Sequence, residues 1–313
     1  MFRRAPFAAF FFTAASIALC QVPSWETLKK AYAYEYAEVK PKIVLKDAPK
    51  ARVEDVSFSG FDGSTATGVF IRPVSEGRYP VVLLLHGLGG SKETMTLHLA
   101  QPLIDRGYAV FALDAPFHGE RRTTESKKEF AELYFGIAKT KTTGDLFAKI
   151  NAIDAENRYR KFLQGICFEG VLDYERALDY LITRPEVDPK RIGLFGYSFG
   201  SIMGSILAGI DSRVRVAVLG VGGDPVLPSI PTMPADFRDR AYLGACSLYV
   251  GHTEAPILML VGEKDDVIGR EASDRLYDAA GPAKSRKIYP TGHSLPEAAF
   301  QDGIEWLVQR LRA

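Results

Sequence analysis

The chain has 313 residues, of which 47% are hydrophobic and 25% are charged, and its formal net charge is +1. This length and composition favour one large α/β domain over two small ones, and they exclude a disordered chain. Because the net charge is near zero and no basic run occurs beyond the first residues, nothing indicates a nucleic-acid partner.

The N-terminal segment differs from the rest of the chain. Arg3 and Arg4 precede an apolar run over 7–19 that has small residues near its end. This order is typical of a secretory signal peptide, and the run is shorter than the about 20 residues that a membrane span needs. We expect residues 1–20 to be removed and the mature chain to be exported, periplasmic or secreted, without stable membrane association. An uncleaved anchor and lipidation at Cys20 are the alternatives.

Apolar and polar patterns then predict the elements in chain order. Residues 21–51 are expected to form a short helix and a surface arm, followed by one main domain over 52–313. Two strands at 53–59 and 64–72 are expected to pair as an antiparallel hairpin. Further strands are expected at 80–85, at 108–113, in a segment that begins at 192, and at 214–219, 257–261 and 286–289. Helices are expected at 92–106, 168–183, directly after Ser198, at 270–280 and after Ser294, which would cap the last helix. Strands alternating with helices imply an α/β fold with a mostly parallel central sheet and helices on both faces.

Two stretches do not follow this alternation. Residues 117–166 are polar, with helical patterns at 124–136 and 145–163, and we expect a helical, lid-like insertion beside the site. Residues 221–254 are rich in proline and predict a second, irregular insertion.

The sequence Gly196-Tyr197-Ser198-Phe199-Gly200 lies between an apolar strand and a helix. In that context G-x-S-x-G is the nucleophile elbow of the α/β-hydrolase fold, a sharp turn that presents the serine hydroxyl at the end of the sheet. The flanking glycines are expected where neighbouring chain passes too close for a Cβ. By itself the pattern also arises by chance, so its place between strand and helix carries the prediction.

A serine nucleophile needs a base, and the base needs an acid that orients it. In this fold the chain order is serine, acid, histidine. His293 is the one histidine after the 257–261 strand, and it follows the last predicted strand. Asp265 is the first choice for the acid and Asp266 is its rival, while Glu263 lies closer to the strand end. The alternative for the histidine is an ordinary surface-loop residue.

The negative oxygen formed during acyl transfer needs hydrogen-bond donors that are already in place. One predicted donor is the backbone N–H of Phe199 at the start of a helix. The other is the backbone N–H of Leu88 in the glycine-rich loop 86–90. The alternative for that loop is a tight strand-to-helix turn without a role in binding.

Several other residues are weaker candidates. His118, Arg121 and Tyr197 are candidates for lining the pocket, although scaffolding is the favoured role of the first two. Cys167 and Cys246 are a candidate disulfide pair, and two separate buried thiols are the alternative. The histidines and cysteines show no metal-ligand spacing, and no phosphate-binding glycine loop is present, so no metal or other cofactor is expected.

Five motifs together resemble the α/β-hydrolases of the dienelactone hydrolase, acetyl xylan esterase and prolyl oligopeptidase-like group. They are H-G-L-G-G at 86–90, D-A-P-F-H-G-E-R at 114–121, P-E-V-D-P-K-R-I-G-L-F-G-Y-S-F-G at 185–200, G-E-K-D-D-V-I at 262–268 and G-H-S at 292–294. The resemblance implies a catalytic Ser198, Asp265 and His293, an acyl-enzyme intermediate and no cofactor. Ser201 departs from the group, in which a second glycine often follows the elbow.

The sequence thus predicts an exported serine hydrolase that acts on a small-molecule carboxylic ester. A prolyl oligopeptidase-like peptidase, a lactonase and a thioesterase would use the same residues and remain alternatives. A non-catalytic binding protein on a hydrolase fold is the alternative of another class. The intact serine, aspartate and histidine at the expected strand ends argue against it. Nothing in the sequence indicates the oligomeric state.

Overall fold

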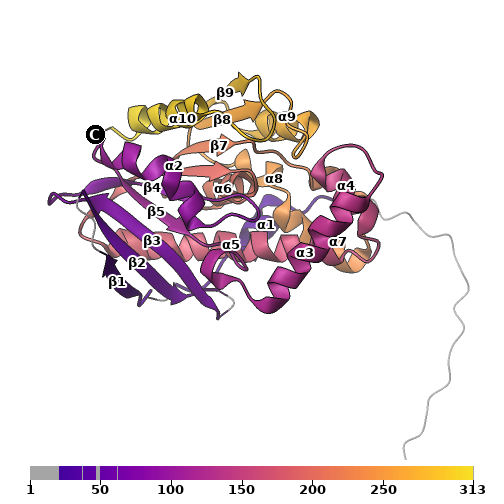
Figure 1. The fold of residues 1–313 in the computed structure, drawn as a ribbon, viewed down its shortest axis with the longest axis horizontal. Coiled ribbons are helices and arrows are strands. Elements are labelled where there is room, and N and C mark those ends of the chain that lie inside the picture. The colour runs from indigo at the N-terminus through magenta and orange to yellow at the C-terminus, as the bar shows by residue number, and fades with distance from the viewer. Residues whose placement is uncertain (1–20, 37, 47–49, 62, 313) are drawn as a thin grey trace, which may run out of the picture.

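A nine-stranded sheet runs through the computed structural model, which describes residues 21–36, 38–46, 50–61 and 63–312 (Figure 1). The predicted signal peptide at 1–20 lies outside the described residues. The strand order is β1-β2-β3-β5-β4-β6-β7-β8-β9. The strands are β1 (Lys42–Lys46), β2 (Ala51–Ser59), β3 (Thr65–Pro73), β4 (Tyr79–Leu85), β5 (Ala109–Leu113), β6 (Val187–Tyr197), β7 (Val214–Gly220), β8 (Ile257–Gly262) and β9 (Lys284–Tyr289).

The sheet is mixed but mostly parallel. The first three pairings, from β1 to β5, are antiparallel, and they include the predicted β2–β3 hairpin. The five pairings that join β5, β4, β6, β7, β8 and β9 are parallel. The predicted α/β architecture is therefore confirmed. The carboxyl ends of the parallel strands meet at one edge, where ligands bind in sheets of this kind.

Helices cover both faces of the sheet because its central strands are apolar on both sides. All seven residues of β4 are buried. Its even-numbered Val82 and Leu84 belong to the core under α2 and α10, whereas Leu83 and Leu85 belong to the core under α5 and α6. The helices are α1 (Trp25–Ala31), α2 (Lys92–Ile104), α3 (Thr124–Lys139), α4 (Leu146–Ile153), α5 (Arg158–Thr183), α6 (Phe199–Ile210), α7 (Ala235–Ala241), α8 (Ser247–Val250), α9 (Arg270–Ala279) and α10 (Glu297–Arg310).

The N-terminal arm is more structured than predicted. Its residues 42–46 form the edge strand β1, in which every residue is exposed, so the sequence offers no alternation from which a strand could be predicted. Tyr32, after α1, is buried, and its hydroxyl donates to the carbonyl oxygen of Leu243 at 2.6 Å. The arm is therefore part of the packed domain.

Two predicted helix starts are wrong. The helix expected at 168–183 begins ten residues earlier, and α5 runs without a break from Arg158 to Thr183. The last helix begins at Glu297 with Pro296 as its N-cap, so Ser294 does not cap it. Ser294 stays in the turn behind His293 because the proline, which fixes φ and has no N–H, is suited to the helix entrance.

The two predicted insertions supply a cover beside the strand ends. Residues 117–166 contain α3, α4 and the start of α5, and 221–254 contain α7, α8 and the short 3-10 helices η2 (Leu227–Thr232) and η3 (Tyr242–Gly244). Figure 1 shows α3, α4 and α7 together at one end of the molecule, at the right of the view. Buried Asp224 fastens the second insertion, since its carboxylate accepts hydrogen bonds from the backbone N–H groups of Val226, Leu227 and Ser247.

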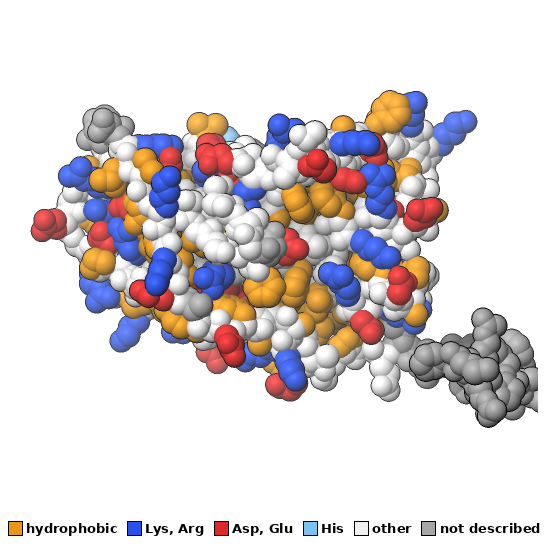
Figure 2. All heavy atoms as spheres, turned by 90° about the horizontal axis from the view of Figure 1, so that it is seen from below, with side chains coloured by type: hydrophobic (Ala, Val, Ile, Leu, Met, Phe, Trp, Pro, Cys, Tyr) orange, Lys and Arg blue, Asp and Glu red, His pale blue; other side chains and the backbone are white. Residues whose placement is uncertain are grey.

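The surface carries both signs of charge. In Figure 2 basic and acidic side chains are interspersed over the face shown, with exposed hydrophobic side chains between them. This distribution agrees with a net charge of +1. Across the described ranges, no helix combines the length and the apolar character needed to span a bilayer.

Candidate active site

Ser198 lies at the sharp turn between β6 and α6. Its φ of 54° and ψ of −115° place it in a strained backbone conformation, which close packing around the turn maintains. A Cβ on Gly200 would lie 2.0 Å from the carbonyl oxygen of Leu85, and one on Gly196 would lie 2.4 Å from the carbonyl oxygen of Gly200. Both flanking glycines are therefore required by close approach of backbone to backbone.

The turn brings Ser198 into contact with the predicted histidine and aspartate. Nε2 of His293 lies 2.8 Å from Oγ of Ser198. Nδ1 of the same ring lies 3.0 and 2.9 Å from the two carboxylate oxygens of Asp265. The serine is 9% exposed, and the side chains of the histidine and aspartate are 22% and 8% exposed. The three residues come from the ends of three different strands, as chain order predicts.

Asp265 is fixed as an ionised acceptor. Its Oδ1 accepts hydrogen bonds from the backbone N–H groups of Val267 at 2.9 Å and Ile268 at 3.1 Å. Burial pushes the pKa of Asp265 upward, but the hydrogen bond with His293, together with the two backbone donors, outweighs burial and lowers it. An ionised Asp265 makes Nδ1 the protonated nitrogen of His293. Nε2 is then free to accept the proton of the serine hydroxyl.

Asp266, the rival acid, is exposed to solvent and has no hydrogen bond to His293 among the contacts of the described residues. Glu263 is also exposed, and its backbone N–H donates to the carbonyl oxygen of Tyr289. The structure therefore brings Asp265, and neither of these two residues, to the histidine.

Leu88 and Phe199, whose backbone N–H groups are the predicted donors, line the same cavity as Ser198. Phe199 is the first residue of α6, so its N–H has no acceptor within the helix. Leu88 lines the same cavity as Ser198, and a Cβ on the preceding Gly87 would be 3.3 Å from that of Ser198. The N–H of Ser198 itself donates to the carbonyl oxygen of Gly220 at 2.8 Å. The serine N–H is therefore already paired, and the N–H groups of Phe199 and Leu88 stay the predicted donors.

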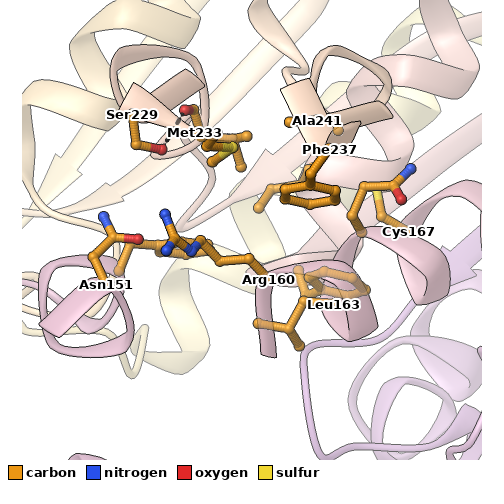
Figure 3. A pocket seen from close by; sticks show the side chains of 14 residues that line it. Asn151, Arg160, Leu163, Cys167, Ser229, Met233, Phe237 and Ala241 are labelled. Atoms are coloured by element: carbon orange, nitrogen blue, oxygen red, sulfur yellow. Dashed lines mark hydrogen bonds between the residues drawn. The ribbon is translucent and has the colours of Figure 1, made fainter. Parts of the chain in front are cut away.

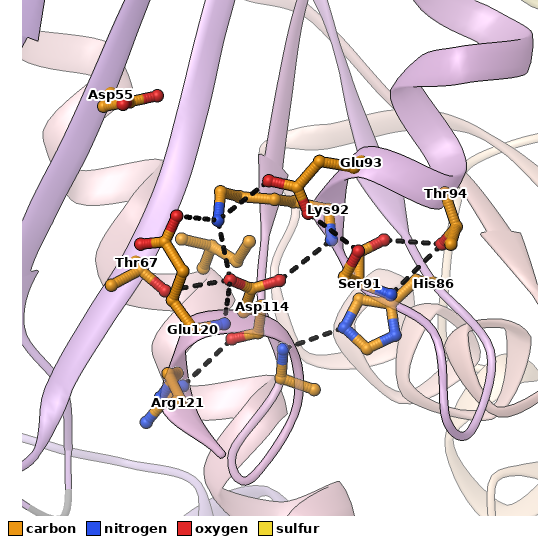
Figure 4. A network of polar contacts seen from close by, with 12 residues as sticks. Asp55, Thr67, His86, Ser91, Lys92, Glu93, Thr94, Asp114, Glu120 and Arg121 are labelled. Atoms are coloured by element: carbon orange, nitrogen blue, oxygen red, sulfur yellow. Dashed lines mark hydrogen bonds and ion pairs between the residues drawn. The ribbon is translucent and has the colours of Figure 1, made fainter.

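A buried polar network supports the loop that carries Leu88 (Figure 4). His86 Nε2 accepts a hydrogen bond from the N–H of Ala115 at 3.0 Å, so its Nδ1 is the protonated nitrogen and donates to the carbonyl oxygen of Gly87 at 2.8 Å. Burial lowers the pKa of His86, which keeps the ring neutral. The ring thus joins the loop after β4 to the turn after β5.

Asp114 is the centre of that network. The Asp114 carboxylate is fully buried and pairs with Nζ of Lys92 at 2.8 Å, and it also accepts the backbone N–H of Lys92 at 2.9 Å. Thr67 and the N–H of Glu120 complete its partners at 3.0 and 3.1 Å. Lys92 also contacts two exposed glutamates, Glu93 and Glu120. These contacts join strand β3, the start of α2 and the segment after β5.

The other predicted pocket residues lie elsewhere. His118 is fully buried, and its Nδ1 bonds to the carbonyl oxygen of Pro116. Arg121 pairs with Asp173 at 2.6 Å and lines a surface hollow separate from the serine. Both are part of the scaffold, the role favoured from sequence.

Tyr197 supports the histidine instead of lining the cavities beside Ser198. Its hydroxyl donates to the carbonyl oxygen of His293 at 2.7 Å and accepts the N–H of Leu295 at 3.2 Å. This contact spans two distant loops, and no local sequence signal indicates it.

The candidate disulfide does not form in the structure. Cys167 and Cys246 are both free and buried. Burial raises the pKa of the Cys167 thiol to about 12, and the thiol of Cys246 donates to the carbonyl oxygen of Gly223. Each side chain therefore behaves as a small core residue, the alternative reading of the sequence.

Two adjoining cavities lie beneath the cover, and the first of them is lined by the serine. The first, which we call the serine cavity, has a volume of about 20 Å³ and is lined by Ser198 and Leu88 together with apolar side chains of α4, α5, α6 and the loop after Asp265. The second, which we call the distal cavity, has a volume of about 40 Å³ and is shown in Figure 3. Phe147, Leu163, Phe199 and Ile202 line both, so the two cavities adjoin.

The lining of the distal cavity was not predicted. It is made by α4, α5, α6, η2, η3 and α7, which contribute Asn151, Arg160, Gln164 and Cys167 among others. These positions lie far apart in sequence and carry no motif. Within the described ranges no group of three or more histidine, cysteine or carboxylate side chains is placed to hold a metal ion.

Comparisons with known proteins show the family of the chain. The family described as "Dienelactone hydrolase family" matches residues 66–299. A protein named putative hydrolase YtaP from Bacillus subtilis (strain 168) is 27% identical over 49% of this chain and 47% of its own length. A protein named acetyl esterase Axe7A from Xylanibacter ruminicola is 28% identical over 71% of this chain and 51% of its own length. The chain thus spans about half the length of these two relatives.

Solved structures show the same fold at low identity. Acetyl xylan esterase 1 from Thermoanaerobacterium sp. JW/SL YS485 superposes with a TM-score of 0.68 and 18% identity, over 92% of this chain and 92% of that one. At this identity the likeness supports the architecture alone.

Proposed function

The chain belongs to the dienelactone hydrolase family, and on that premise we propose that it is a serine hydrolase that cleaves a carboxylic ester through an acyl-enzyme. The observation that carries the proposal is the continuous contact from Asp265 through His293 to Ser198. This arrangement supplies a nucleophile, a base that contacts it and an acid that orients the base.

The proposed reaction has two halves. Nε2 of His293 takes the proton of Ser198 while Oγ attacks the ester carbonyl, and the carbonyl oxygen becomes negative. As that intermediate collapses, the protonated His293 gives its proton to the leaving alcohol oxygen, and the acyl group stays on Oγ. Water then attacks the acyl-enzyme with His293 as base, which releases the acid and restores the serine hydroxyl.

The N–H groups of Phe199 and Leu88 stabilise the negative oxygen in both halves. Loss of one such donor in serine hydrolases costs roughly 10²–10³ in kcat. The His86 ring fixes the Leu88 loop before substrate arrives, so the donors need no rearrangement during the reaction.

The peptidase, lactonase and thioesterase alternatives use the same three residues. The name of one relative, acetyl esterase Axe7A, favours an ester over the other acyl donors. A panel of p-nitrophenyl acetate, a p-nitroanilide, a γ-lactone and an acyl thioester separates the four. Hydrolysis of the anilide at a higher kcat/KM than the ester would overturn the esterase assignment.

A fluorophosphonate probe tests the nucleophile directly. We expect it to label the folded protein on Ser198, and Ser198→Ala to abolish both labelling and p-nitrophenyl acetate hydrolysis. Ser212→Ala, at an exposed serine beyond α6, is the matched control and should retain both. Absence of labelling in the folded wild-type protein would favour the non-catalytic binding protein.

We also propose export, on the basis of the charged start and apolar run in residues 3–19. Expression of the full chain in a bacterial host, followed by mass spectrometry of the N-terminus in each cell fraction, tests this. A mature N-terminus close to residue 21 outside the cytoplasm is expected. An intact Met1 in the cytoplasmic fraction alone would contradict it.

A further inference from the structure

The first insertion, residues 117–166, contacts the loop that carries Leu88. Nη2 of Arg122, which precedes α3, donates to the carbonyl oxygen of Gly89 at 2.7 Å. Gly89 directly follows Leu88, whose N–H is a predicted donor to the negative oxygen. A shift of Gly89 therefore also shifts the peptide groups on either side of it. We call residues 86–90 the oxyanion loop.

The same insertion contacts the loop that carries Asp265, residues 265–269, which we call the acid loop. The N–H of Leu146 donates to the carbonyl oxygen of Val267 at 3.0 Å. The N–H of Val267 in turn donates to Oδ1 of Asp265 at 2.9 Å. Leu146 is the first residue of α4, so its N–H has no acceptor within the helix. Val267 thus joins the start of α4 to the carboxylate that orients His293.

Tight packing within the insertion joins these two contacts. A Cβ built on Gly136 of α3 would lie 2.7 Å from Cδ1 of Ile153 on α4, so the two helices approach closely. Arg158, at the start of α5, pairs with Glu132 of α3 at 2.8 Å. The helices α3 and α4 and the start of α5 therefore form one packed unit that reaches both loops.

Both contacts support groups that meet charge only during the reaction. The N–H of Leu88 is the predicted donor to the negative oxygen, and Asp265 stabilises the imidazolium that forms when His293 takes the serine proton. A displacement of about 1 Å can cost roughly 10² in rate. Loss of either contact should therefore lower the rate constant of acylation and leave the dissociation constant of the ester nearly unchanged.

Resting on the proposed serine hydrolase function, we propose that the first insertion is a positioning element of the active site. Arg122 holds the oxyanion loop through Gly89, and the N–H of Leu146 holds the acid loop through Val267. The insertion thus sets the geometry of the catalytic groups besides covering the cavities. Arg122 and Leu146 are positioning residues in this sense, because each acts through a neighbouring loop.

The contact of Arg122 is tested by Arg122→Met and Arg122→Lys. Stopped-flow release of p-nitrophenol from p-nitrophenyl acetate separates the acylation rate constant from the dissociation constant of the ester. We expect Arg122→Met to lower the rate constant roughly tenfold and to change the dissociation constant about twofold or less. Arg122→Lys keeps a cationic donor and should recover part of the rate. Arg106→Met is the matched control and should keep wild-type values, since exposed Arg106 also donates to a backbone carbonyl oxygen, that of Pro102.

Leu146→Pro removes the N–H of the second contact. Proline is favoured at the first position of a helix, and the extended backbone of Asp145, with φ of −69° and ψ of 175°, is compatible with a following proline. Leu146→Ala is the matched control, since it shortens the side chain and keeps the N–H. We expect acylation of Leu146→Pro to be roughly fivefold slower than that of Leu146→Ala.

The Asp265→Asn background shows whether this effect passes through the acid. There the acid no longer orients the histidine, so Leu146→Pro and Leu146→Ala should react with a fluorophosphonate probe at equal rates. A proline variant that is slower than the alanine variant in this background as well overturns the positioning role and leaves only structural damage.

The remaining outcomes decide each contact separately. Equal acylation rates of Arg122→Met and the wild-type protein overturn the role of Arg122, and equal rates of Leu146→Pro and Leu146→Ala overturn that of Leu146. If Leu146→Pro does not fold, leucic acid at position 146, which keeps the side chain and replaces the N–H with oxygen, should slow acylation roughly fivefold relative to the wild type, and an unchanged rate overturns the proposal. A wild-type protein that hydrolyses no ester and reacts with no fluorophosphonate overturns the proposed function itself.

Discussion

Replacing Asp265 with asparagine tests how the acid acts. In the structure one carboxylate oxygen, Oδ1, accepts the N–H groups of Val267 and Ile268, and both oxygens face Nδ1 of His293. An asparagine has one oxygen, and the two backbone donors hold it. Its NH₂ group must then point at Nδ1 of the histidine, which can meet a donor only as an acceptor.

This change reverses the histidine tautomer. With Nδ1 unprotonated, the proton lies on Nε2, 2.8 Å from Oγ of Ser198, and the ring cannot take the serine proton. In a serine protease the same substitution lowers kcat by roughly 10⁴, which is about 5.4 kcal/mol of transition-state stabilisation. We expect a loss of this order for Asp265→Asn. Stability should change by about 1 kcal/mol or less, because the backbone donors keep their acceptor.

The assay is the pre-steady-state release of p-nitrophenol from p-nitrophenyl acetate, with urea unfolding in parallel. Asp266→Asn is the matched control, since it makes the same change at the exposed neighbouring carboxylate and should retain full activity. The lowered pKa of Asp265 also means that the wild-type rate should show no titration of this group above about pH 5. Retention of more than a tenth of the wild-type kcat by Asp265→Asn, or a large loss in Asp266→Asn, would refute the reasoning.

Three further predictions concern stability, each measured by urea unfolding. Gly200→Ala would place Cβ 2.0 Å from a backbone oxygen and should lower the free energy of unfolding by about 3–5 kcal/mol. Gly165→Ala, in open space on α5, should raise it by about 0.5–1 kcal/mol. Similar effects of the two substitutions would contradict the close-approach argument. Lys92→Met should lower the free energy of unfolding by about 3–5 kcal/mol, because it leaves Asp114 buried without its cation. The double variant with Asp114→Asn should recover part of that loss. Additive losses of the two substitutions would argue against the pairing. Burial, with repulsion from neighbouring aspartates, raises the pKa of Glu175 to about 8, so the folded state holds a proton that the unfolded state loses near pH 4.5. Stability should therefore fall as pH rises from about 4.5 to 8, and Glu175→Gln should flatten that slope; an unchanged slope would count against the shift.

The chemistry at the strand ends was predictable because it obeys local rules. The G-x-S-x-G turn, the acid after β8 and the histidine after β9 each follow an apolar strand, and parallel strands bring their carboxyl ends together. The choice of Asp265 over Asp266 rested on spacing. The structure explains it through the two backbone donors that turn the side chain toward His293.

What the sequence could not predict depends on contacts between distant segments. The hydroxyl of Tyr197 and the ion pair of Lys92 and Asp114 both depend on partners 22 or more residues away. The edge strand β1 has no buried side, so no periodicity marks it. The two cysteines show the same limit, since the sequence could not decide between a bridge and the two free thiols of the structure.

The unbroken course of α5 has a mechanical consequence. At about 1.5 Å per residue its 26 residues form a rod of about 39 Å. The N-terminal part of the rod forms a wall of the distal cavity, and the C-terminal part packs under the sheet. That wall cannot move outward without disturbing the core, so any widening of the distal cavity depends on the other elements that line it, such as α4, η2 and α7. Substitutions along α5 can therefore change the lining of the distal cavity while the position of the helix stays fixed.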